Sequence, residues 1–285
     1  NLPLATNTPG ARPSALSPAG RDCAGGVAAW GTAAPTASVG DRVMGVTLGA
    51  FAPYALVDHR HVIAVPDSLS WTDAAALPVA LATEHDALAQ GGFGLRESVL
   101  VVGATSSVGL IAVQLAKALG ASRVIATTTS DGKAETLRAI GADVVVNTAS
   151  ENLAEAMAAA NDGAGADLTL DHVGGRLFAD TFLATRIGGT VVNVGRLAGA
   201  ESTIDLDQLS FRRLRVIGTT FSVRTPDELA DVCTGLMADV VPAVAEGRIR
   251  AVVDSVFAFD DAKAAADRMR SGEAVGKIVL ELPES

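Results

Sequence analysis

The central part of this 285-residue sequence alternates short runs of β-branched residues with Ala- and Leu-rich stretches. That alternation is the pattern of parallel βαβ units, in which each strand is followed by a helix that crosses back over the sheet. Six strands are expected, at Ser98–Val102, Arg123–Thr127, Asp143–Val146, Asp167–Asp171, Thr190–Val194 and Arg215–Thr219. The sequence therefore predicts an α/β fold with a doubly wound parallel sheet.

The stretch before this alternation has a different pattern. Short apolar runs such as Arg42–Val46 and Tyr54–Val57 lie between turn residues, as in an irregular antiparallel β domain. Ser70 can cap a helix that runs through Ala74–Leu77, and a second helix is expected at Thr83–Gln90.

The end of the chain returns to a mixed pattern. It predicts a helix from Pro226 to about Gly247, a strand near Ala251–Val256, a helix at Asp260–Ser271 and a last strand at Lys277–Leu282. We expect residues 1–85 to form a β-rich unit, residues 86–222 the parallel sheet, and residues 223–285 to complete the first unit.

Charge and composition narrow the classes of function. The chain has 32 acidic and 22 basic side chains, a net charge of −10, which disfavours binding to nucleic acid or to anionic membranes. No apolar segment is long enough to span a bilayer, and Cys23 and Cys233 are too few for a disulfide framework. These features favour the reducing cytoplasm. Because Asn1 is not an initiator Met, the sequence is expected to begin inside a longer gene product.

The turn after the first expected strand carries the clearest chemical signal. Residues 103–109 read Gly-Ala-Thr-Ser-Ser-Val-Gly between a strand and a helix. Such a turn lets main-chain N–H groups at a helix N-terminus approach a diphosphate, so it favours dinucleotide binding over a purely structural turn. Ser106 stands where the usual G-x-G-x-x-G pattern has its middle glycine, and a side chain there can either crowd the diphosphate or donate to it.

The end of the second strand distinguishes between the two nicotinamide cofactors. A carboxylate directly at this strand end would select NADH, and none is present there. Instead Thr127, Thr128, Ser130 and Lys133 offer hydroxyls and an ammonium, which favours NADPH, although Asp131 counts against a phosphate. The alternative is that Ser130 only caps the next helix and Lys133 is solvated.

Taken together, these segments resemble the zinc-free quinone oxidoreductase branch of the medium-chain dehydrogenase/reductase superfamily. The residues that carry the resemblance are 20–25, 39–43, 77–80, 103–117, 141–143, 170–175, 188–192 and 276–280. The resemblance implies a GroES-like substrate domain, a Rossmann domain that binds NADPH, a cleft between them where hydride reaches a quinone or an activated alkene, and a homodimer.

The resemblance also implies roles for individual residues. Asn1 and Thr83 are candidates for positions near the nicotinamide, and no catalytic residue is certain. Val173, Gly174, Val194 and Gly195 correspond to backbone segments beside the cofactor. The expected cofactor contacts are Thr83, Gly103, Thr105, Ser106, Ser107, Val108, Gly109, Thr127, Thr128, Ser130, Lys133, Val173, Gly174, Val194, Gly195 and Arg196.

Two departures from the superfamily are visible. Zinc-dependent relatives have Gly-His-Glu where this chain has Gly20-Arg21-Asp22, so no zinc site is expected. The first strands of the substrate domain also precede Asn1 in relatives, so we expect that domain to be N-terminally incomplete.

The sequence therefore predicts an NADPH-dependent reductase of quinones or α,β-unsaturated carbonyls that acts without metal. Two alternatives stay open. One is an enoyl reductase that acts on an acyl thioester, and the other is a non-catalytic NADP-binding structural or regulatory protein.

Overall fold

A computed structural model describes residues 19–31 and 37–283, which form two compact units. One unit, the β-rich unit, contains the described residues up to 79 together with residues 225–245 and 251–283. The other, the parallel-sheet unit, contains residues 80–224 and 246–250. The first boundary was expected after residue 85, but it lies inside a continuous helix, α2 (Pro78–Gly91).

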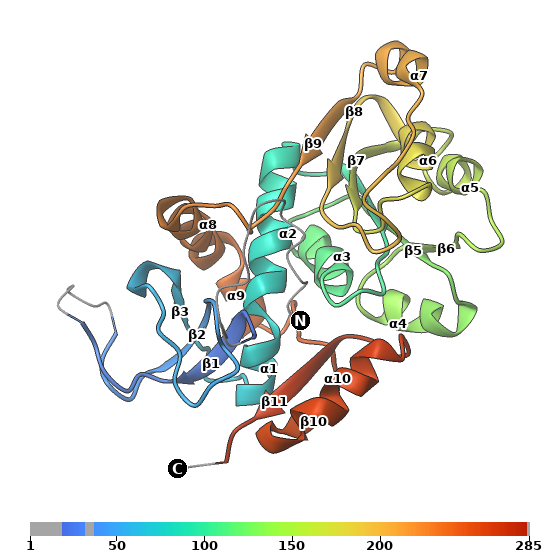
Figure 1. The fold of residues 1–285 in the computed structure, drawn as a ribbon. Coiled ribbons are helices and arrows are strands. Elements are labelled where there is room, and N and C mark those ends of the chain that lie inside the picture. Colours follow the sequence, from blue (N-terminus) through green and yellow to red (C-terminus); the bar gives the residue numbers. More distant parts are fainter. Residues whose placement is uncertain (1–18, 32–36, 284–285) are drawn as a thin grey trace. The chain divides into compact units, whose positions relative to one another are not determined.

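The parallel-sheet unit contains six strands: β4 (Ser98–Val102), β5 (Arg123–Thr128), β6 (Val144–Asn147), β7 (Ala166–Asp171), β8 (Thr185–Asn193) and β9 (Arg215–Gly218). Their order is β6-β5-β4-β7-β8-β9, and every neighbouring pair is parallel (Figure 1). The chain thus reverses its direction of winding between β4 and β7. This is the doubly wound sheet that the sequence predicted.

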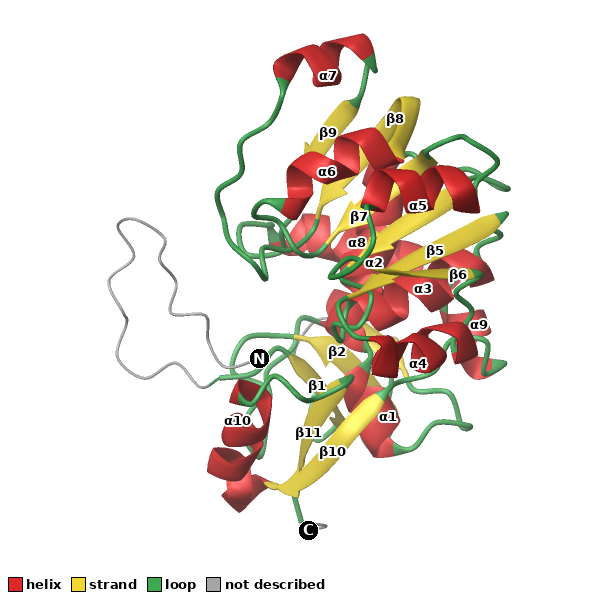
Figure 2. Ribbon diagram, turned by 90° about the vertical axis from the view of Figure 1, so that its right-hand side faces the viewer, coloured by secondary structure: helices red, strands yellow, loops and turns green. Residues whose placement is uncertain are grey.

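Helices cover both faces of this sheet, as Figure 2 shows, with α5 (Leu153–Ala160) and α6 (Leu177–Ala184) on one face and α2 and α3 (Gly109–Ala118) on the other. The shorter segments are η2 (Asp131–Lys133), α4 (Ala134–Ala139) and α7 (Leu206–Phe211). All five residues of β4 are buried, because this strand has a neighbour on each side and helices on both faces.

The β-rich unit has an antiparallel sheet of β1 (Asp22–Gly26), β2 (Arg42–Val46) and β3 (Val62–Ala64), as expected from the turn-rich sequence. A parallel pair joins β10 (Val253–Ala258) to β11 (Lys277–Glu281), accompanied by η1 (His59–His61), α1 (Trp71–Ala76), η3 (Phe259–Asp261) and α10 (Ala262–Arg270). The segment Tyr54–Val57 resembled a strand in sequence but belongs to none. Tyr54 and Leu56 are exposed, so their apolar character does not mark a buried face.

Helix α2 begins at Pro78, five residues before the predicted start at Thr83. Proline is favourable at the first helical position, where its missing N–H is not needed. The next N–H, that of Val79, donates to Oδ1 of Asp22 at 2.6 Å. The cap of this helix therefore comes from β1, far away in sequence, which explains why the local pattern missed it.

The single helix expected from Pro226 to about Gly247 is two helices, α8 (Pro226–Asp239) and α9 (Val241–Ala245). Pro242 is the physical reason, since it cannot donate the main-chain hydrogen bond that a continuous helix requires at that position.

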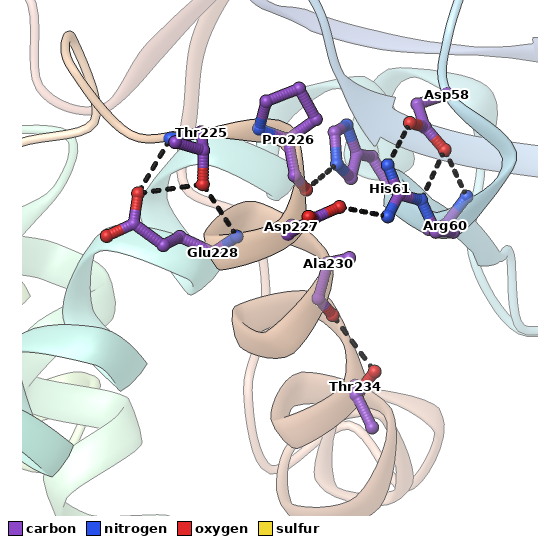
Figure 3. A network of polar contacts seen from close by, with 9 residues as sticks. All are labelled: Asp58, Arg60, His61, Thr225, Pro226, Asp227, Glu228, Ala230 and Thr234. Atoms are coloured by element: carbon purple, nitrogen blue, oxygen red, sulfur yellow. Dashed lines mark hydrogen bonds and ion pairs between the residues drawn. The ribbon is translucent and has the colours of Figure 1, made fainter.

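The start of α8 is held in place by polar contacts within the β-rich unit (Figure 3). Thr225 and Glu228 form a reciprocal capping box. Arg60 pairs with Asp227 at 2.5 Å, and Nε2 of His61 lies 2.8 Å from the carbonyl oxygen of Pro226. These contacts fix the point at which the chain rejoins the β-rich unit.

Among the described residues, no helix is both long and apolar enough to cross a membrane.

Candidate functional site

The sequence-predicted site residues lie in the parallel-sheet unit, apart from Asn1, which is outside the described residues. Apart from Thr83 on α2, they lie at or just after the carboxyl ends of β4, β5, β7 and β8. These ends lie at one edge of the sheet because neighbouring strands are parallel. The winding direction changes between β4 and β7, so these strand ends surround the point at which open α/β sheets bind ligands.

The turn between β4 and α3 is tightly packed main chain. Gly103 has a φ of 77°, a conformation that favours glycine. A Cβ added to Gly109 would lie 2.6 Å from the carbonyl oxygen of Gly103 and 2.8 Å from the Cα of Ala104. Both glycines are therefore required by the geometry of the turn.

The side chain of Ser106 connects the two ends of this turn by hydrogen bonds. Its hydroxyl donates to the carbonyl oxygen of Gly103 at 2.9 Å and accepts from the N–H of Gly109 at 3.0 Å. The side chain thus acts as a local cap. Among the described residues, the main-chain N–H groups of Thr105, Ser107 and Val108 have no hydrogen-bond acceptor. The turn therefore presents a cluster of unsatisfied donors at the start of α3, which is the chemistry that a diphosphate requires.

The residues at the end of β5 and just after it divide into two groups. The hydroxyl of Thr127 accepts from the N–H of Gly103 at 2.9 Å, and that of Thr128 accepts from the N–H of Ser130 at 3.1 Å. Both threonines are buried, so their hydroxyls hold the strand ends and the turn in shape. Ser130 and Lys133 are only partly buried, and Thr129, which the predicted site set omitted, is exposed.

Asp171, the last residue of β7, organises two loops that sequence analysis had assigned to the site. Its buried carboxylate accepts from the N–H groups of Val173 and Gly174 at 3.0 Å each. Its main-chain carbonyl accepts from those of Val194 and Gly195, at 2.7 and 3.0 Å.

The four N–H groups that Asp171 binds are therefore already satisfied. The carbonyl oxygens of Gly174 and Val194, in contrast, accept no hydrogen bond from the described residues. These loops can offer acceptors to a ligand amide. Asp171 itself was not predicted as a site residue. Its position at the carboxyl end of a buried strand was the available signal.

A buried ion pair lies directly behind the turn. Nε2 of His172 is 2.9 Å from Oε1 of Glu84, and Nδ1 of His172 is 2.8 Å from the carbonyl oxygen of Val102. Burial alone would lower the pKa of His172, but the charge and hydrogen bond of Glu84 outweigh it and raise that pKa. The sequence had assigned no role to His172, since a lone histidine in a loop carries no signal.

Thr83 and Arg196 are the remaining predicted contacts. Thr83 precedes the buried Glu84 on α2 and is partly exposed. Arg196 is exposed, with Nη1 3.4 Å from the side-chain oxygen of Asn193.

In the β-rich unit, the aspartate at the position of the zinc relatives' glutamate is already engaged. Oδ2 of Asp22 lies 2.6 Å from Nζ of Lys277, while Oδ1 accepts from Val79. The neighbouring thiol of Cys23 donates to the carbonyl oxygen of Gly45, and burial raises its pKa to about 11.

Known proteins resemble this chain in sequence and in fold. The family of zinc-binding dehydrogenases matches residues 107–237. Quinone oxidoreductase-like protein 2 of Bos taurus is 28% identical over 92% of this chain and 76% of its own length. A solved structure of Escherichia coli quinone oxidoreductase complexed with NADPH superposes with a TM-score of 0.81, at 27% identity, over 95% of this chain and 84% of the other.

The chain thus resembles the quinone oxidoreductase branch of the medium-chain dehydrogenase/reductase superfamily over most of its length. The chain is also 32% identical to the erythronolide synthase EryA2 of Saccharopolyspora erythraea. That similarity covers 93% of this chain and only 7% of the synthase.

Proposed function

We propose that this protein is an oxidoreductase that binds NADPH at the carboxyl edge of its parallel sheet and reduces a quinone or an α,β-unsaturated carbonyl without a metal. The main support is the turn from Gly103 to Gly109. Gly103 has a positive φ, the main chain packs too closely for a side chain at Gly109, and the turn presents unsatisfied N–H groups. The NADPH in the structure of the Escherichia coli relative supports the choice of cofactor.

The residues around the turn fit such a nucleotide. The N–H groups of Thr105, Ser107 and Val108 would bind the diphosphate. Lys133 and Ser130 would bind the 2′-phosphate, because an ammonium and a hydroxyl are donors that suit a dianion. On the other side, the carbonyl oxygen of Val194 would accept from the carboxamide.

Bound NADPH would supply the hydride, so the chain itself needs no nucleophile and no acid–base triad. Its task is to orient the nicotinamide and to keep water from the reacting carbon. Thr83 is our candidate for a hydroxyl near the nicotinamide, and Arg196 for a further cofactor contact. Asn1 stays a prediction from sequence.

A second candidate function is the reduction of an enoyl thioester. The observation that favours it is the similarity to erythronolide synthase and the 31% identity to the spectinabilin polyketide synthase system protein NorB of Streptomyces orinoci. A non-catalytic NADP-binding role is the third alternative.

The deciding experiment follows the nicotinamide absorbance of NADPH in a stopped-flow instrument with a quinone, an enone and an enoyl thioester. Rapid oxidation with the quinone or the enone is expected. Turnover with the thioester alone would favour the second candidate. Tight NADPH binding without oxidation by any of the three would favour a non-catalytic protein.

We also propose that the protein lies in the cytoplasm and that it forms a homodimer. The dimer contact would be made through β9. β9 is the last strand of the sheet, and Val216 on it and Phe211 before it are 43% and 77% exposed. An exposed strand edge with apolar neighbours favours pairing with a second copy. Light scattering on the purified protein tests this, and a monomer at high protein concentration would contradict it.

A further inference from the structure

The segment from Thr127 to Lys133 carries one carboxylate, that of Asp131. A free carboxylate after the second strand would repel a 2′-phosphate and favour NADH. We propose that Asn147 is a specificity-determining residue, which holds Asp131 against β6 and so preserves the preference for NADPH. This inference rests on the proposed function.

The contact between the two residues is direct. Asn147 is the last residue of β6 and is paired in register with Thr128 at the end of β5. Its side-chain nitrogen Nδ2 donates to Oδ1 of Asp131 at 2.7 Å. The parallel register of two neighbouring strands therefore places the amide beside the segment that would meet the ribose.

The orientation of the Asn147 amide is fixed by a second contact. Its oxygen Oδ1 accepts from the N–H of Ala149 at 3.0 Å, within the turn that follows β6. Because the oxygen is engaged there, the nitrogen is left to face Asp131. Asn147 thus combines a role in the turn with a role in holding the carboxylate.

Lys133 is the charged side chain near this contact that is best placed to meet the 2′-phosphate of the ribose. The carboxylate of Glu151 accepts from the main-chain N–H of Asn147 at 2.6 Å, and Glu135 is exposed on α4. Lys133 follows Asp131 by two residues and forms no ion pair with the described residues. The amide of Asn147 holds the carboxylate of Asp131 toward β6, and the ammonium of Lys133 is then the group of this segment that can approach a phosphate.

The test is a double-mutant cycle with Asn147→Ser, Asp131→Asn and the double variant, titrated with NADPH and with NADH by fluorescence. Serine keeps an oxygen that can accept from Ala149 but loses the amide donor. We expect Asn147→Ser to weaken NADPH binding about fivefold, because the repulsion between one exposed carboxylate and a phosphate a few ångströms away is of that size. NADH has no such phosphate, and its binding should be unchanged. In the Asp131→Asn background, Asn147→Ser is expected to have no effect on the preference for NADPH over NADH.

A further readout separates this charge effect from a structural one. The loss in NADPH affinity caused by Asn147→Ser should shrink at high salt, because an exposed charge is screened. An equal loss for both nucleotides, or an equal loss of NADPH affinity in both backgrounds, would overturn the inference while leaving the proposed function intact. A folded wild-type protein that binds neither nucleotide would overturn both.

Discussion

His172 and Glu84 form a buried ion pair, with Nε2 of the imidazole 2.9 Å from Oε1 of the carboxylate. The other carboxylate oxygen, Oε2, is buried and has no hydrogen-bond partner among the described residues. A pair of this kind is costly to break, because removing one partner leaves the other charge buried alone. It lies behind the turn at Gly103, whose added Cβ would be 3.4 Å from the Cβ of His172.

The ion pair predicts a pH dependence of stability. The pKa of His172 is raised in the folded state above its ordinary value of 6.5. The stabilisation by the pair is therefore fully present below about pH 6.5 and is lost as the pH rises through the raised pKa. Denaturant unfolding from pH 6 to pH 9 (roughly the range in which histidines titrate) should show a free energy of unfolding that falls with pH. His172→Gln should remove this component of the slope, and an unchanged slope would contradict the assignment.

Gly109→Ala is expected to abolish most of the binding of NADPH. The new Cβ would lie 2.6 Å from the carbonyl oxygen of Gly103, which is main chain and cannot move aside without opening the turn. The strain should also lower the free energy of unfolding by about 1–3 kcal/mol. Gly218→Ala is the matched control, since an added Cβ there meets no atom within 4 Å. Titration and thermal melting of both variants provide the measurement, and retained affinity in Gly109→Ala would argue against the turn as the diphosphate site.

Ser106→Ala tests whether the serine acts as an internal cap of the turn. Loss of its two hydrogen bonds, to Gly103 and from Gly109, should cost about 1–2 kcal/mol of stability. Ser107→Ala should change stability by less than about 0.5 kcal/mol, because that side chain is partly exposed. Urea denaturation of the two variants distinguishes them. Equal stabilities would show that the hydroxyl of Ser106 is dispensable.

Lys133→Met is expected to weaken NADPH binding about tenfold and to leave NADH binding unchanged, because only NADPH carries the phosphate that the ammonium would attract. Lys117→Met is a suitable control, since Nζ of Lys117 already pairs with Asp143 at 2.7 Å. Dissociation constants from fluorescence titration measure both effects. A parallel loss for the two nucleotides would indicate that Lys133 supports the fold and does not select the cofactor.

Asp167→Asn should lower stability without affecting the cofactor. Partial burial alone would raise the pKa of Asp167, but hydrogen bonds from Ser98 and Arg186 outweigh it and lower that pKa. The carboxylate therefore stabilises the fold above its ordinary pKa of 3.8, and this contribution is lost as the pH falls through the lowered value. Because the site is partly exposed, we expect a loss of about 1 kcal/mol near neutral pH.

The difference between wild type and Asp167→Asn should disappear in acid. NADPH affinity should stay unchanged, since Asp167 lies near the amino end of β7 and the candidate site follows the carboxyl end. A clear change in affinity would mean that the two ends of the sheet are coupled.

The sequence alone determined the six parallel strands, the glycine turn after β4 and the set of segments that follow the strand ends. These features depend on periodicity and on residues close in the chain, such as Gly103 and Gly109, so neighbouring residues suffice to predict them. The break at Pro242 also had a local cause. It was missed because the helical pattern continues on both sides of the proline.

Only the tertiary structure determined which polar groups form hydrogen bonds or ion pairs with one another. Thr127 holds Gly103, Asp22 caps α2, Glu84 pairs with His172, and Asn147 binds Asp131. In each pair the partners are at least 16 residues apart and meet because strand register or packing brings them together. A sequence pattern shows which donors and acceptors exist. Which of them remain available to a ligand depends on the contacts that folding makes between distant segments, since each hydrogen-bonding group that is satisfied inside the fold is no longer free to bind.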